Sequence, residues 1–278
     1  MKQFLRFFVL LAIISTIFTS CHKEFSTIQK SKDVKYKLAK ADEYFTKKKY
    51  SNARVLYEQL FPAYKGQDKF EELYYKYAFC HYYEKLYPEA EQLFKGFLEF
   101  FPNSVHAEEV DYMRAYSFYK QSPKLELEQV NTLKAINMMQ TFINQHIGSP
   151  RVKDANAVID EGRAKLELKE AREAQLFYNL GQFRAAGIAY NNIINSFPET
   201  RKGDEYKLMV VKSYYKFAKL SITEKQIERF EKVITEYQDF ADRFPESGLI
   251  KEAESFNKLS LNNIKILTNE QTSSPTRL

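Results

Sequence analysis

The stretch LYPEAEQLFKGFLEFFP, residues 86–102, decides the fold because its spacing returns four more times along the chain. Counted from Tyr87, a small residue follows at +3 (Ala90), aromatic residues follow at +7 and +10 (Phe94 and Phe97), and a proline follows at +15 (Pro102). These intervals place the three inner side chains on one face of a helix, with the proline beyond its end. The stretch therefore predicts the second helix of a helical hairpin.

The other copies of this spacing begin at residues 50, 132, 183 and 230. The copies at 183 and 230 keep a proline at +15, the first copy has its proline early (Pro62), and the copy at 132 has Ile147 in its place. We expect long loops between the two helices of repeats three and five, the former over 120–129. The first helix of repeat four is expected to reach back from Asn179 towards Arg151, with Gly162 as a weak point inside it.

Small residues are needed where the axes of packed helices approach closely. The pattern assigns this packing role to Ala41, Ala53, Ala78, Ala90, Ala115, Ala174 and Ala186. Helix pairs of this kind are typical of tetratricopeptide repeats. The composition agrees, since Gly and Pro number only 8 each against 20 Tyr and 23 Phe. We predict an all-α, right-handed superhelical solenoid of about five hairpins, closed by a C-terminal capping helix.

The N-terminus has the features of a targeting segment. Lys2 and Arg6 precede an uncharged run over residues 7–18, and Cys21 follows two small residues. The run is shorter than the ~20 residues that span a bilayer as a helix. It favours a lipoprotein signal peptide over 1–20, with a covalent lipid on Cys21 as the only non-protein group expected. Ordinary secretion with an incidental cysteine is the alternative.

Several functional classes lack support in the sequence. Without residues 1–20 the chain carries 40 basic and 36 acidic residues, a net charge of +4, which is too weak to predict a nucleic-acid partner. The second cysteine, Cys80, is expected in the core. No metal-ligand or catalytic motif is present, and we expect neither a metal site nor an enzyme. The histidines are scattered at positions 22, 81, 106 and 146.

The first helices of repeats two and three carry an excess of aromatic residues on the face predicted to line the concavity of the solenoid. These are Tyr75, Phe79, Tyr82, Tyr112, Tyr116 and Tyr119. A tyrosine can pack its ring while its hydroxyl stays hydrated, which suits the capture of an extended peptide. The alternative is that part of this set fills space between helices. The lysines of repeat one likewise fit either an anionic membrane surface or a solvated face.

The chain resembles the BamD family of lipoproteins, which belong to the outer-membrane β-barrel assembly machinery. The resemblance rests on the signal ending at Cys21, on the five repeats with their long loops, and on two runs. These runs are YEQLFPAYKGQDKFEELYYKYAFCHYYEKLYPEAEQLFKGFLEFFPNS and KAINMMQTFINQHIGSPRVKDAN. The resemblance covers about residues 21–268.

The resemblance implies a scaffold anchored by its lipid to the periplasmic face of the outer membrane. It implies that C-terminal repeats bind the periplasmic domains of a BamA-type barrel partner, and that N-terminal repeats receive C-terminal segments of unfolded barrel proteins. We accordingly expect a lipidated tether over 21–33, substrate-side repeats over 34–147, partner-side repeats and capping helix over 148–268, and a disordered tail over 269–278. A lipidated cell-envelope or nutrient-binding scaffold that holds a glycan or another protein is the alternative.

Overall fold

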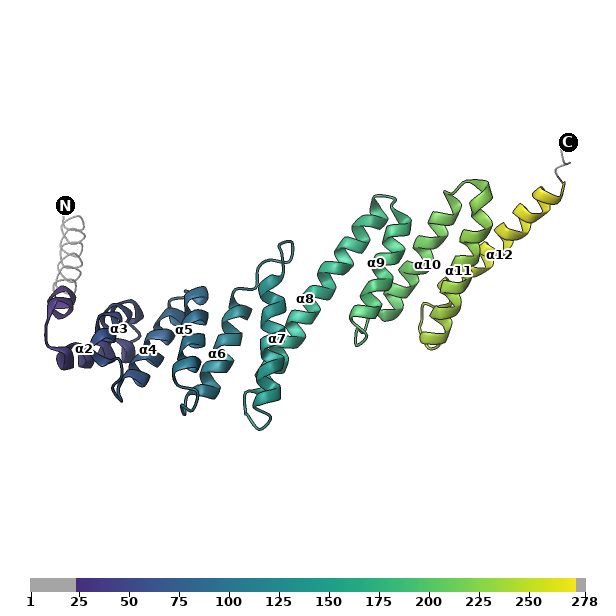
Figure 1. The fold of residues 1–278 in the computed structure, drawn as a ribbon. Helices are drawn as coiled ribbons and strands as arrows, with labels where there is room; N and C mark the ends of the chain where they lie inside the picture. Colours follow the sequence, from purple (N-terminus) through teal and green to yellow (C-terminus); the bar gives the residue numbers. More distant parts are fainter. Residues whose placement is uncertain (1–23, 274–278) are drawn as a thin grey trace, which may run out of the picture. The chain divides into compact units, whose positions relative to one another are not determined.

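The computed structural model describes residues 24–273, and all regular secondary structure within that range is helical. Residues 24–30 form a short helix. The remaining helices follow in the order α2 (Val34–Thr46), α3 (Tyr50–Tyr64), α4 (Phe70–Tyr83), α5 (Tyr87–Phe100), α6 (Ala107–Lys120), α7 (Val130–Gln145), α8 (Val152–Asn179), α9 (Phe183–Ser196), α10 (Gly203–Lys219), α11 (Thr223–Arg243) and α12 (Ile250–Ser273) (Figure 1). The predicted all-α architecture of helix hairpins is confirmed.

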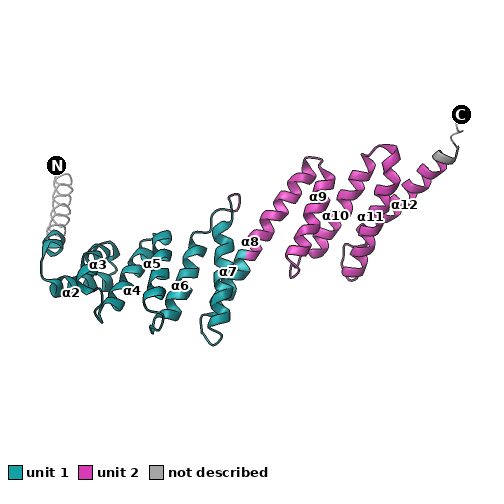
Figure 2. Cartoon of the chain, in the orientation of Figure 1, with its two compact units in different colours: residues 1–124, 128–162 teal, residues 125–127, 163–278 magenta. Residues whose placement is uncertain are grey.

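The chain divides into two compact units (Figure 2). Unit 1 contains residues 1–124 and 128–162, and unit 2 contains residues 125–127 and 163–278. In unit 1 each helix from α2 to α6 packs on the helix that follows it in the chain, and the last of these contacts is that of α6 with α7. In unit 2, α10 packs on α9, α11 and α12. Consecutive packing of this kind is what a repeat array requires, because each hairpin buries its apolar face on its neighbours.

The repeating intervals of the second helices mark the core. In α5, Ala90, Phe94 and Phe97 are fully buried. The corresponding residues of α3, Ala53, Tyr57 and Leu60, are at most 1% exposed. All seven alanines assigned to helix packing are buried, with Ala115 the most exposed at 1%. Small side chains at these positions let packed helices approach closely.

A hydroxyl residue joins successive repeats at four equivalent places, always 17 residues after the start of the spacing pattern. Each hydroxyl oxygen donates to a carboxylate on a first helix of the preceding repeat and accepts from a backbone N–H two residues ahead. The donor bonds are Ser104 to Glu71 (2.6 Å), Ser149 to Glu108 (2.5 Å), Thr200 to Glu167 (2.7 Å) and Ser247 to Asp204 (2.6 Å). The accepted N–H groups belong to His106, Arg151, Lys202 and Leu249. We call these four contacts the inter-repeat staples.

Helix α8 is the predicted long helix of repeat four and continues without a break through Gly162. The division between the two units falls at this glycine. A Cβ atom there would lie 2.8 Å from Cγ1 of Ile136, so the glycine allows α8 to approach the α7 side chain closely. The unit boundary thus lies within α8 rather than at residues 147 and 148, because the first turns of α8 pack in the core of unit 1 through Ala155, Val158 and Ile159.

Three local expectations are wrong. The loop before the second helix of repeat five is not long: only three residues separate the end of α10 at Lys219 from the start of α11 at Thr223, so the helix rather than the loop is lengthened. The tether expected over 21–33 is helical over 24–30, where Ile28 is 1% exposed and packs into the core. The tail expected from residue 269 is helical as far as Ser273. The predicted signal peptide and Cys21 lie outside the described residues.

Candidate functional site

The six predicted groove residues lie on α4 and α6, both in unit 1. Phe79 and Tyr112 are buried, at 4% and 7% exposure. They pack on the second helices, Phe79 against Phe94 with ring centroids 5.1 Å apart and Tyr112 against Phe142 at 5.5 Å. Their side chains therefore offer little surface to a ligand. The half-buried members of the set are Tyr75, Tyr82, Tyr116 and Tyr119, which we call the aromatic face.

The rings of the aromatic face are held by other aromatic rings. Tyr116 stacks on Tyr112 at 5.6 Å and lies 5.2 Å from Tyr119. Tyr82 contacts the ring of Tyr87, the first residue of α5, at 5.5 Å. Ring contacts of this kind fix side-chain orientation beyond the effect of buried area alone. The arrangement of these tyrosines is therefore set before any ligand arrives.

Hydrogen bonds fix the Tyr75 end of the aromatic face. The Tyr75 hydroxyl donates to Oε2 of Glu109 at 2.8 Å, and Arg151 donates to Oε1 of the same carboxylate at 2.8 Å. The imidazole of His106 stacks on the Tyr75 ring at 4.3 Å. Burial and the Glu109 bond both raise the pKa of Tyr75, so its hydroxyl stays protonated and acts as a donor.

Further polar contacts extend from the Tyr75 end of the aromatic face towards the N-terminal helices and form a row. Lys76 bridges Glu72 (3.1 Å) and Asp42 (2.9 Å), and Asp42 also accepts from the Tyr57 hydroxyl at 2.7 Å. Nε2 of His106 lies 3.4 Å from Glu72. The row thus ties together the first helices of the repeats beside the aromatic face. It gives unit 1 a surface of fixed polar groups next to fixed rings.

The Tyr119 end has a different chemistry. The Tyr119 hydroxyl donates to Glu161 at 2.5 Å, and this bond, with burial, raises the pKa of Tyr119 to about 12. Nζ of Lys120 lies 4.9 Å from the centroid of the Tyr116 ring and 5.6 Å from that of Tyr119. Both distances are within the range of a cation–π contact. A lysine charge is therefore held over two tyrosine rings.

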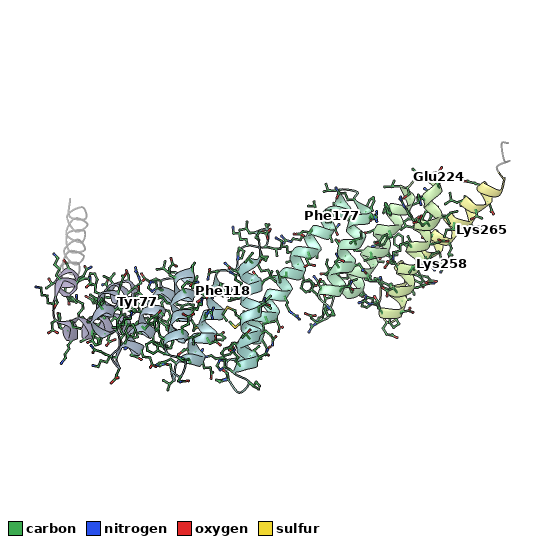
Figure 3. The ribbon with its side chains drawn as sticks, in the orientation of Figure 1. Tyr77, Phe118, Phe177, Glu224, Lys258 and Lys265 are labelled. Atoms are coloured by element: carbon green, nitrogen blue, oxygen red, sulfur yellow. The ribbon has the colours of Figure 1, made fainter. Side chains whose placement is uncertain are left out.

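Sequence reasoning missed the polar partners of the aromatic face. Glu109 precedes Tyr112 by three residues and Lys120 follows Tyr116 by four, so both positions are on the tyrosine side of α6 by helical spacing alone. Arg151 directly precedes α8 and Glu161 lies within it, and no local signal links them to α6. Away from this face, Phe118 of α6 (labelled in Figure 3) also lies under a lysine, with Lys134 at 5.3 Å from its ring centroid.

Unit 2 offers a second surface. Large apolar side chains are exposed at two of its turns, Leu180 (63%) before α9 and both Leu220 (74%) and Ile222 (68%) before α11. These turns lie at the same edge of unit 2 in Figure 2. A pocket in the same unit lies between α9, α10 and α11 and is lined in part by Arg184, Tyr214, Phe217, Arg229 and Lys232.

Among the described residues no group of three or more His, Cys, Asp or Glu side chains is arranged to hold a metal ion. Across the same residues, no helix combines the length and apolar character needed to span a membrane. Cys80 is fully buried, and burial raises the pKa of its thiol.

The comparisons with known proteins identify the family. The family model described as YfiO, outer membrane lipoprotein, matches residues 28–226, which include most of the helical repeats. The chain belongs to the YfiO family. The protein is accordingly an outer membrane lipoprotein, and the resemblance drawn from its repeats is confirmed.

The YfiO family assignment agrees with a curated relative. A protein of Aquifex aeolicus (strain VF5), named as an outer membrane protein assembly factor of the BamD type, is 26% identical over 189 residues. The match covers 68% of this chain and 59% of the relative, so it spans little more than half of the relative's length. A solved structure, the TPR2AB domain of yeast Sti1 in a pHSP90 complex, covers 82% of this chain and 98% of its own at 12% identity, with a TM-score of 0.41.

Proposed function

We propose that this protein is a lipid-anchored scaffold subunit of the outer-membrane β-barrel assembly complex, facing the periplasm. A lipid on Cys21 anchors it, the aromatic face of unit 1 receives C-terminal segments of unfolded outer-membrane proteins, and unit 2 binds the periplasmic domains of a BamA-type partner. The observation that carries the proposal is the YfiO family match over residues 28–226. The relative named as an assembly factor supports the same role.

The aromatic face supports the peptide-receiving part of the proposal. Its four tyrosines are half-buried, so each ring has a packed side and an open side. Glu109 fixes the orientation of Tyr75 and Glu161 fixes that of Tyr119, which reduces the entropy lost when a ligand is bound. Rigid amphipathic rings of this kind bind apolar side chains of an extended segment while their hydroxyls stay hydrated.

The exposed apolar residues of unit 2 support the partner-binding part. Leu180, Leu220 and Ile222 are all more than half exposed and lie on turns at one edge of the unit. Clustered exposed apolar side chains are typical of protein interaction sites. The nearby pocket adds Arg184 as a charged lining group. A partner-binding unit is thus distinct in composition from the tyrosine-rich peptide-binding unit.

Peptide binding by the aromatic face is tested by the double variant Tyr82→Ala/Tyr116→Ala. The measurement is the affinity of the purified full chain for a fluorescent peptide that ends in an aromatic residue. Each anchor that is lost costs about 1 kcal/mol or more, so we expect binding at least about tenfold weaker. Both tyrosines are half-buried rather than central to the core, and circular dichroism checks that the fold is retained.

The matched control is Tyr36→Ala, because Tyr36 is 43% exposed on α2 and is not part of the aromatic face. Its affinity should equal that of the wild type. Equal affinity of the double variant and the wild type would place peptide binding elsewhere on the molecule. A scaffold that holds a glycan or another envelope protein, the alternative function, predicts no binding of the peptide by any variant.

A further inference from the structure

Lys120 carries a charge that its surroundings leave without a carboxylate partner. It is exposed at the last position of α6, and its Nζ lies over the rings of Tyr116 and Tyr119. Among the described residues no carboxylate is recorded within ion-pair distance of it. Arg151 and Lys76, also beside the aromatic face, differ because they are paired, Arg151 with Glu109 at 2.8 Å and Lys76 with Asp42 at 2.9 Å. Lys120 is therefore the cation of this face that is available to an incoming anion.

The groups around Lys120 form a defined corner of the aromatic face. Tyr116 and Tyr119 lie beneath the ammonium, and burial, together with the nearby Tyr116, raises the pKa of Tyr82 at the same corner. Glu161 is the acidic group at this corner, and it already accepts the Tyr119 hydroxyl. Its negative charge disfavours the approach of several anions at once. The corner therefore suits one carboxylate placed next to an aromatic side chain.

The end of a polypeptide supplies this combination. A segment from the interior of a chain carries no backbone charge, whereas the last residue carries an α-carboxylate within a few ångströms of its own side chain. We infer that Lys120 binds the α-carboxylate of the last residue of a bound peptide, while the aromatic side chain of that residue packs against Tyr82 and Tyr116. This inference rests on the proposed peptide-receiving function and assigns the end of the peptide to one corner of the face. Lys120 is then the residue that distinguishes a chain end from an internal segment.

The test compares two ten-residue peptides that end in phenylalanine and differ only in a free carboxylate or a carboxamide at the C-terminus. Each is labelled at its N-terminus and titrated with the purified full chain, and fluorescence anisotropy gives the affinity. Charge-assisted hydrogen bonds are stronger than neutral ones, so the wild type should bind the free acid about tenfold more tightly than the amide. Lys120→Gln should bind both peptides equally, at the wild-type affinity for the amide. Lys120→Arg should keep the preference.

Lys134→Gln is the matched control, since Lys134 is also an exposed lysine over an aromatic ring but lies on α7 above Phe118. This variant should discriminate between the two peptides as the wild type does. The wild-type preference should also shrink as salt is raised, because exposed charges are screened.

Equal binding of acid and amide by the wild type would overturn the assignment of Lys120 while leaving peptide binding intact. So would an unchanged preference in Lys120→Gln. If the wild type binds neither peptide, the proposed peptide-receiving function fails and the inference fails with it. The two failures are thus distinguished by whether the amide peptide binds at all.

Discussion

At the scale of single residues, the side chains beside the aromatic face are placed by polar partners from other helices. Tyr75 and Tyr119 each donate to a glutamate, Glu109 on α6 and Glu161 on α8. A half-buried hydroxyl with a fixed acceptor has one preferred orientation, and the ring follows it. In unit 2 a polar side chain held by partners from another helix is a lysine that is almost completely buried.

Lys207 is that residue, at 1% exposure. Its Nζ lies 2.5 Å from Glu236 and also contacts the carboxylate of Asp239, so it joins α10 to α11. Removing one partner of a buried ion pair leaves an uncompensated charge, which typically costs about 3 to 5 kcal/mol. In Lys207→Met, Glu236 keeps its second ion pair, with Lys232 at 2.6 Å, so its charge is still compensated in part. We therefore expect the variant to lower the free energy of unfolding by about 2 to 3 kcal/mol.

Denaturant unfolding followed by circular dichroism measures this loss. Lys225→Met is the control, because Lys225 forms an exposed pair with Glu228 in the same unit and such pairs contribute at most about 1 kcal/mol. Similar losses in the two variants would contradict a special role for the buried lysine.

At the scale of elements, the repeats are joined by the inter-repeat staples as well as by apolar packing. Each staple combines a bond to a carboxylate with a bond to the backbone that leads into the next first helix. It therefore fixes both the turn between repeats and the position of the turn against the preceding helix. The staple at Ser149 is present although Ile147 replaces the usual proline, so the register of repeat three is maintained without it.

Ser104→Ala tests the contribution of a staple. The variant loses the bond to Glu71 and leaves the His106 N–H without its acceptor, and a hydrogen bond to a charged group contributes about 1.5 to 3 kcal/mol. Since the site is only partly buried, we expect a loss of about 1 to 2 kcal/mol in the free energy of unfolding of unit 1. Ser51→Ala, at an exposed position of α3 in the same unit, should change stability by less than about 0.5 kcal/mol. Equal stability of the two variants would show that apolar packing alone joins the repeats.

The second helices could be predicted from the sequence because their signal is local. Intervals of three and four residues within one helix select the side that is buried, as Ala90, Phe94 and Phe97 illustrate. The staples could not be predicted as contacts, since the partners are 33 to 43 residues apart and nothing local pairs them. The start of α11 was missed because the residues before Phe230 are polar and resemble a loop, yet they continue the helix back to Thr223.

The candidate site shows the same limit. Helical spacing placed six aromatic residues on one side of α4 and α6, but it could not separate Phe79 and Tyr112, which are buried by α5 and α7, from the half-buried four. That distinction depends on which side chains the neighbouring helices bring, here Phe94 and Phe142. Two further groups complete the site, Arg151 just before α8 and Glu161 within it, and their positions depend on tertiary packing in the same way.

At the scale of the whole molecule, the protein is an outer membrane lipoprotein whose two compact units differ in surface chemistry. Unit 1 presents fixed tyrosines beside Lys120, and unit 2 presents exposed apolar turns. The central claim is that this chain is a stable subunit of a barrel-assembly complex. A scaffold with such a role should be found together with its barrel partner when membranes are dissolved gently.

Co-purification from mildly solubilised outer membranes, with a tag on the C-terminus of the full chain, tests this claim most directly. We expect a BamA-type barrel protein in the eluate at equal stoichiometry, identified by mass spectrometry. The Cys21→Ser variant should be released from the membrane fraction, whereas Cys80→Ser, at the buried cysteine, should remain in it. Recovery of the anchored protein without a barrel partner, or with a glycan-binding system instead, would contradict the account.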